Sequence, residues 1–230
     1  MNLHSVTITV TGHAERTVAP NRCTVVLRVH ADGPTRDHAA EPVTAAVATI
    51  TELVTELREQ SPSPVKRWVF DRVRHGRHRP YHRDGKTKPW VYTSSASITV
   101  TFHGFDAVGP FVERVAAVET VTVADLRWWV TRKAQRTRLA RVRELAVRDA
   151  RGKAETYAAA LGCGTVRPVA VADPGMLGTR PSPSPGGGPV MRAAMMSSDA
   201  VAADESGPGL VFEPERITLT ADVEARFEAV

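Results

Sequence analysis

The chain has 230 residues, 42% hydrophobic and 24% charged, which is ordinary for a globular protein and leaves enough core to fold without disulfide staples. Its two cysteines, Cys23 and Cys163, lie in apolar runs, so we expect buried thiols. Residues 1–12 lack a basic region followed by an apolar run, and no apolar stretch is long enough to cross a membrane. We therefore expect a cytoplasmic protein that makes no membrane contact.

The net charge of +5 is concentrated in two basic stretches. Residues 66–88 and 132–153 each hold nine Lys or Arg against two acidic residues, so the remainder of the chain is net acidic. Two basic stretches on an acidic body indicate either a docking surface for an anionic partner or complementary contacts between subunits.

Hydrophobic periodicity predicts the elements in chain order. The first strand, with Ile8 and Val10 on one face, is expected to end at Gly12 and to form a hairpin with the next strand. In that second strand, Val25 and Leu27 face one way while the side chain of Arg28 faces the other. The expected strands lie at 6–12, 22–31, 65–74, 92–103, 121–130, 165–172 and 217–224, and the expected helices at 35–60, 106–118 and 138–162.

The helix at 138–162 carries the longest apolar stripe, and its central alanines would let it sit close to the structure that it covers. We expect Thr137 to be its N-cap and Gly162 its left-handed C-terminal cap. Gly152 lies on the opposite face, where either the close approach of another chain or drift on an exposed surface would explain it. The stripe consists of Leu139, Val142, Ala146, Ala150, Ala154, Tyr157 and Leu161.

Residues 173–209 change character, with six Pro, seven Gly and almost no periodicity. They predict a flexible insertion within a single domain that spans residues 1–230. The element order β-β-α-β-β-α-β-α-β-β predicts the α+β class, with a mainly antiparallel sheet and helices on one face.

Taken together, four stretches resemble the SIMPL-domain (DUF541) family. They are ITVTGHAERTVAPNRCTVVLRV, Arg79-Pro80-Tyr81, AVRDARGKAETYAAALG and ITLTADVEARF, and their order and spacing carry the match. The chain departs from the family in having Pro20-Asn21 where Pro-Asp is usual, and in a hairpin tip richer in Arg and His. The resemblance implies an oligomerising module with links to stress tolerance and without established catalytic residues.

The polar tip at 75–89 has two possible ligands besides protein. Its histidines, with His103 further on, are metal-ligand residue types, but their spacing is irregular and neighbouring arginines repel cations, so we expect neither a metal nor a cofactor. Trp68, Tyr81 and Trp90 interleave with the cations of this region, as in surfaces that bind nucleic acid. The favoured role is an arm that meets an acidic surface on another subunit, with nucleic-acid binding as the alternative.

No catalytic motif is found, and the acids of the long helix, Glu144, Asp149 and Glu155, are expected to form helical salt links. The rings of Trp128 and Trp129 should face opposite sides of their strand, with one in the core and one available to a partner. We therefore expect a non-enzymatic homo-oligomer that binds other macromolecules. The candidate interface residues are Arg74, Arg77, Arg79, Tyr81, Arg83, Trp90, Trp129 and Gly152.

Overall fold

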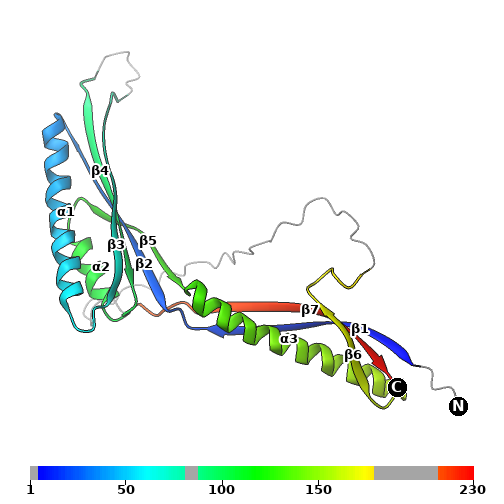
Figure 1. Cartoon of the computed structure of the whole chain (residues 1–230). Coiled ribbons are helices and arrows are strands. Elements are labelled where there is room, and N and C mark those ends of the chain that lie inside the picture. The colour runs from blue at the N-terminus through cyan, green and yellow to red at the C-terminus, as the bar shows by residue number, and fades with distance from the viewer. Residues whose placement is uncertain (1–4, 81–87, 179–211) are drawn as a thin grey trace, which may run out of the picture. The chain divides into compact units, whose positions relative to one another are not determined.

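The computed structural model describes residues 5–80, 88–178 and 212–230, and these form seven strands and three helices (Figure 1). The α+β class and the predicted element order are both confirmed. The elements are β1 (Val6–Val18), β2 (Arg22–Gly33), α1 (Arg36–Glu59), β3 (Val65–His78), β4 (Val91–Phe102), α2 (Val108–Ala116), β5 (Val121–Trp129), α3 (Arg132–Ala160), β6 (Val166–Ala172) and β7 (Ile217–Ala229).

The strands form two sheets, with orders β1-β7-β6 and β3-β4-β2-β5. The predicted hairpin between the first two strands is therefore wrong, because β1 pairs with β7 while β2 pairs antiparallel with β4 and β5. Each sheet belongs to its own compact unit: residues 19–80, 88–131 and 212–217 make one, and residues 5–18, 132–178 and 218–230 make the other.

In the first unit, α1 and α2 cover one face of the four-stranded sheet. Alternate residues of β2 and β4, among them Leu27 and Ile98, are fully buried against Ile50 of α1 and Phe111 of α2. Thr35 caps α1 by accepting a hydrogen bond from the His38 amide at 3.3 Å. In the described part of the chain no helix covers the opposite face of the sheet, and most of its side chains are partly or fully exposed.

In the second unit, α3 packs along the three-stranded sheet, where β1 and β7 run side by side (Figure 1). The buried residues of α3 follow a single row in steps of four, and this row is inclined to the helix axis. Tyr157 and Leu161 fall to the side of the row and are exposed, so the predicted stripe is wrong at its C-terminal end. The row is Val142, Ala146, Ala150, Ala154 and Ala158.

The structure corrects the predicted N-cap of α3 and confirms its predicted C-terminal cap. The helix begins at Arg132, so Thr137 is not its N-cap; its hydroxyl instead donates to the Lys133 carbonyl one turn back. Gly162 has a φ of 76°, and the Cys163 amide donates to the Ala158 carbonyl at 2.9 Å. This is the left-handed glycine cap expected from the sequence.

Residues 173–178 form turns that are tied to β7. The amides of Gly175 and Leu177 donate to the Glu224 carboxylate at 2.8 and 3.1 Å, and these bonds lower the pKa of that carboxyl. The remainder of the predicted insertion, residues 179–209, lies outside the described part of the chain. A single domain over residues 1–230 stays a prediction.

Candidate binding surfaces of the four-stranded sheet

Strand β3 forms one edge of the four-stranded sheet and is exposed along most of its length. Two apolar side chains on its α1-facing side, Phe70 and Val73, remain 41% and 45% exposed. Large apolar side chains beside the open edge of a sheet are unusual for a surface that stays in water, because such an edge can pair with another chain.

At the end of the β3–β4 hairpin, two arginines flank an aromatic ring. The guanidinium carbons of Arg77 and Arg79 each lie 4.5 Å from the ring centroid of Trp90, which is itself 38% exposed. Cation–π contacts of this kind order the long side chains on the ring. The structure thus brings together three of the predicted interface residues.

Most of this hairpin belongs to the sheet and does not project from it. Strand β4 pairs with β2 as far as Tyr92 opposite Gly33, and with β3 as far as Val91 opposite His78. The expected arm is therefore confined to the hairpin end beyond these pairs. Tyr81, His82 and Arg83, which were predicted for this tip, lie outside the described residues.

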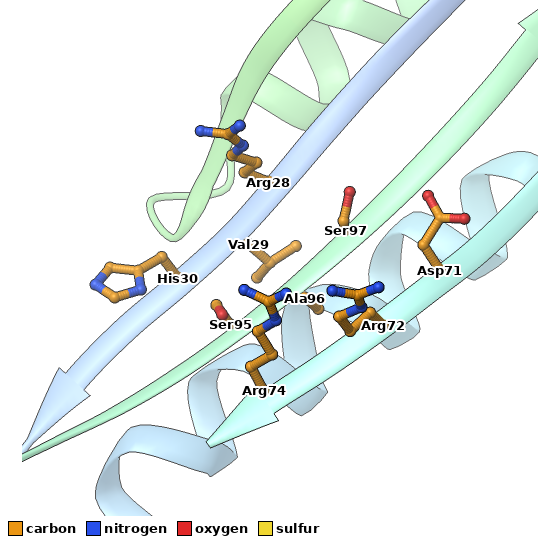
Figure 2. Close-up of a pocket in the computed structure, with 9 residues that line it drawn as sticks. All are labelled: Arg28, Val29, His30, Asp71, Arg72, Arg74, Ser95, Ala96 and Ser97. Atoms are coloured by element: carbon orange, nitrogen blue, oxygen red, sulfur yellow. The ribbon is translucent and has the colours of Figure 1, made fainter. Parts of the chain in front are cut away.

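The helix-free face of the sheet gathers cations over two adjacent rows (Figure 2). Ser97 of β4 pairs with Arg28 of β2 on one side and with Arg72 of β3 on the other. In the next row, Ser95 lies between His30 and Arg74. These side chains line a depression of about 700 Å³.

A β-bulge in β3 shapes this depression. Phe70 pairs with Ile98 and Arg72 with Ser97, which leaves Asp71 as the extra residue. Its carboxylate accepts a hydrogen bond from the Thr99 hydroxyl at 3.1 Å and lies among the residues lining the depression. The bulge thus places an acid next to Arg72.

A family model described as "SIMPL: Protein of unknown function (DUF541)" matches residues 8–227, nearly the whole chain. The chain belongs to the SIMPL family. A comparison with curated proteins finds no match. The SIMPL match includes every surface residue named above, but its description assigns them no function, so their chemistry has to be argued from their geometry.

The tryptophan pair of this SIMPL chain is divided between the two faces of β5. Trp128 lies opposite Cys23 and packs edge-on against Phe105, with ring centroids 4.8 Å apart. Trp129 donates its indole N–H to the Thr24 hydroxyl at 2.9 Å on the helix-free side. Both rings are half-buried, and a contact between Trp129 and a partner stays a prediction.

The second basic stretch of the SIMPL chain lies on α3. The predicted helical salt links are present: Lys153 Nζ lies 2.7 Å from Asp149 Oδ2, Arg151 Nε lies 2.8 Å from Glu155 Oε1, and Arg141 pairs with Glu144. A β-carbon added to Gly152 would meet nothing within 4 Å, so neither explanation offered for this glycine is favoured.

One cluster in the SIMPL chain has catalytic residue types. His13 Nδ1 lies 2.7 Å from Asp222 Oδ1, and the His13 amide donates to Asp149 at 2.8 Å. These groups are about half exposed, and the hydrogen bonds tie β1 to β7 and α3. Among the described residues, no three His, Cys, Asp or Glu side chains are grouped to hold a metal ion, and no helix could span a membrane.

Sequence reasoning missed Phe70, Val73, Arg28 and Arg72. For Arg28 a signal was present, because the alternation in residues 22–31 already placed it on the face opposite Leu27. Its proximity to Arg72 depends on the pairing of β4 with both neighbours.

Proposed function

We propose that this chain is a non-enzymatic module that self-assembles and binds other macromolecules, with the end of the β3–β4 hairpin at the contact between copies. The observation that carries the proposal is the edge strand β3, on which Phe70 and Val73 are exposed and which leads to the Arg77–Trp90–Arg79 cluster at the hairpin end. Apolar and aromatic side chains supply area to an interface, and the flanking cations select the partner surface.

Charge favours a contact between two different surfaces of the copies. Two β3 edges placed together would bring arginines against arginines, which is unfavourable. An opposite charge is available on α1, where Glu52 and Glu59 line a shallow groove together with Glu56, which is itself paired with Arg114 at 2.7 Å. A basic edge on an acidic helix is a heterologous contact, which forms rings or filaments according to its geometry.

The test is the solution mass of the full chain by light scattering, at micromolar concentration and at low and high salt. The double variant Arg77→Glu/Arg79→Glu should lower the mass, and salt should weaken the wild-type assembly because exposed charge pairs are screened. The matched control is Lys66→Glu/Arg127→Glu, two exposed cations of the same unit at the far end of the sheet. A monomeric wild-type protein would contradict self-assembly.

A second candidate is nucleic-acid binding, favoured by the same exposed cations and by the Trp90 ring between them. It predicts that affinity for random-sequence DNA falls steeply and linearly on a logarithmic salt scale. Affinity without such a slope, or no affinity at low salt, would count against it.

A further inference from the structure

The depression on the helix-free face of the four-stranded sheet is built from rigid positions. Arg28, Ser97 and Arg72 lie in one row across three paired strands, and His30, Ser95 and Arg74 lie in the next (Figure 2). Neighbouring rows on one face are about 7 Å apart and alternate strands about 10 Å apart. Strand pairing therefore fixes the backbone positions of these arginines a short distance apart.

Arg28, Arg72 and Arg74 outnumber the acids that line the depression, since Asp71 is the one carboxylate among the described lining residues. No ion pair or hydrogen bond joins Arg28, Arg72 or Arg74 to another described residue, although each guanidinium offers five donors. Of the nearby acids, Asp71 accepts a hydrogen bond from the neutral Thr99 hydroxyl and keeps its charge, while Asp32 lies 3.2 Å from His30 Nε2. An anion placed here would accept hydrogen bonds from guanidinium donors that have no such partner among the described residues.

The boundaries of the cluster limit the size of that anion. On one side, the row of Val26 and Thr99 carries Asp125 on β5 and the Asp71 carboxylate. On the other side, Asp32 follows His30 along β2. Carboxylates at both ends would repel a long polyanion laid along the strands, whereas a compact anion fits between them.

The chemistry of the lining favours phosphate. Guanidinium groups bind phosphate oxygens through two parallel N–H donors, and the hydroxyls of Ser95 and Ser97 can donate from below. None of the described residues that line the depression is Phe, Tyr or Trp, so it lacks the large rings on which bases stack most strongly.

From these observations we propose that the depression binds a small anion carrying several phosphates, held between Arg28 and Arg72 over Ser97 and steadied by Arg74 over Ser95. The site does not involve Arg77, Arg79 or Trp90, and it does not depend on self-assembly. A small polyphosphate ligand would add a specific binding activity to the module.

The test is a calorimetric titration of the full chain with inorganic tripolyphosphate, at constant ionic strength set with chloride. Arg28→Gln and Arg72→Gln should each weaken binding about tenfold, because each removes a charge-assisted hydrogen-bonding group. Arg72→Lys, which keeps the charge but loses the planar fork, should weaken binding less. Arg67→Gln is the matched control, since Arg67 is an exposed arginine of the same strand that pairs with Thr101, beyond the acidic row.

Circular dichroism and thermal melting of each variant establish that the fold is intact. No binding by the wild-type protein would overturn the proposal. Equal losses in Arg67→Gln and Arg72→Gln would also overturn it, because general positive potential would then explain the affinity. A single-stranded DNA oligonucleotide that binds where tripolyphosphate does not would show an extended polyanion surface instead.

Discussion

Gly12 of β1 crosses α3 so closely to Ala146 that a β-carbon added to the glycine would lie 2.0 Å from the Ala146 carbonyl oxygen. The same added atom would lie 2.7 Å from the Ala150 β-carbon. The strand continues through Gly12 to Val18, so the prediction that this glycine ends the strand is wrong. Its physical role is to remove a side chain where a strand meets the backbone of a helix.

Gly12→Ala should therefore destabilise the protein strongly. We expect a loss of roughly 1–3 kcal/mol, toward the upper end, because the clash is with helix backbone that cannot rotate away. Chemical denaturation followed by circular dichroism measures it.

The control is Gly152→Ala on the exposed face of α3, where an added β-carbon meets nothing within 4 Å. This change should stabilise the helix by about 0.5–1 kcal/mol, since alanine loses less backbone entropy than glycine. If Gly152 touches another copy, Gly152→Ala should instead weaken self-association. Equal stability of the two alanine variants would contradict the close approach of β1 to α3.

The alanine row of α3 should be sensitive to size. Ala150 is fully buried, so Ala150→Leu should cost roughly 1–3 kcal/mol through overpacking. Ala159, an exposed neighbour of the row, should accept glutamine within about 0.5 kcal/mol. Thermal melting of the two variants compares them, and similar tolerance at both positions would mean that a different helix face is buried.

Ionisation of Asp149 should make the stability of the second unit depend on pH. A hydrogen bond from Lys153, and then one from the His13 amide, lower the pKa of its carboxyl. The ionised form is thus favoured in the folded state. Its contribution to the free energy of unfolding is fully present above the unfolded pKa of about 3.9, and it is lost as the pH falls through the lower folded pKa. The side chain is 38% exposed, so solvent and salt reduce the effect.

Accordingly, Asp149→Asn should lower the melting temperature at neutral pH, and its difference from wild type should shrink below about pH 4. Asp106→Asn is the control, because Asp106 is an exposed carboxyl outside α3. A difference between Asp149→Asn and wild type that stays constant with pH would show that the carboxylate charge contributes nothing.

Cys23 should be chemically inert in the folded protein. Burial, and secondarily the Asp125 charge, raises the pKa of its thiol to about 12, and no part of the residue is exposed. Because the thiolate is the nucleophile, iodoacetamide should label the half-buried Cys163 first and Cys23 only after unfolding. Peptide mass spectrometry over a time course measures this, and equal native labelling would show that β2 opens readily.

Sequence periodicity determined the elements and their order, because the spacing of apolar residues along a strand or helix is a local property. Local chemistry also located the Gly162 cap, which depends on residues within one helical turn. The family could be recognised for the same reason, since its motifs are short stretches in a fixed order.

Strand pairing was decided only by the tertiary structure. The 6–12 strand and the 22–31 strand are neighbours in sequence and equally suited to a hairpin, but each buries its apolar face against a different helix and sheet. Which strands pair depends on how closely the apolar faces of strands and helices pack together, as the close crossing of Gly12 over Ala146 illustrates. Strand register likewise places Arg28 and Arg72 on either side of Ser97. Register depends on how separate strands align, so it cannot be read from any single stretch of sequence.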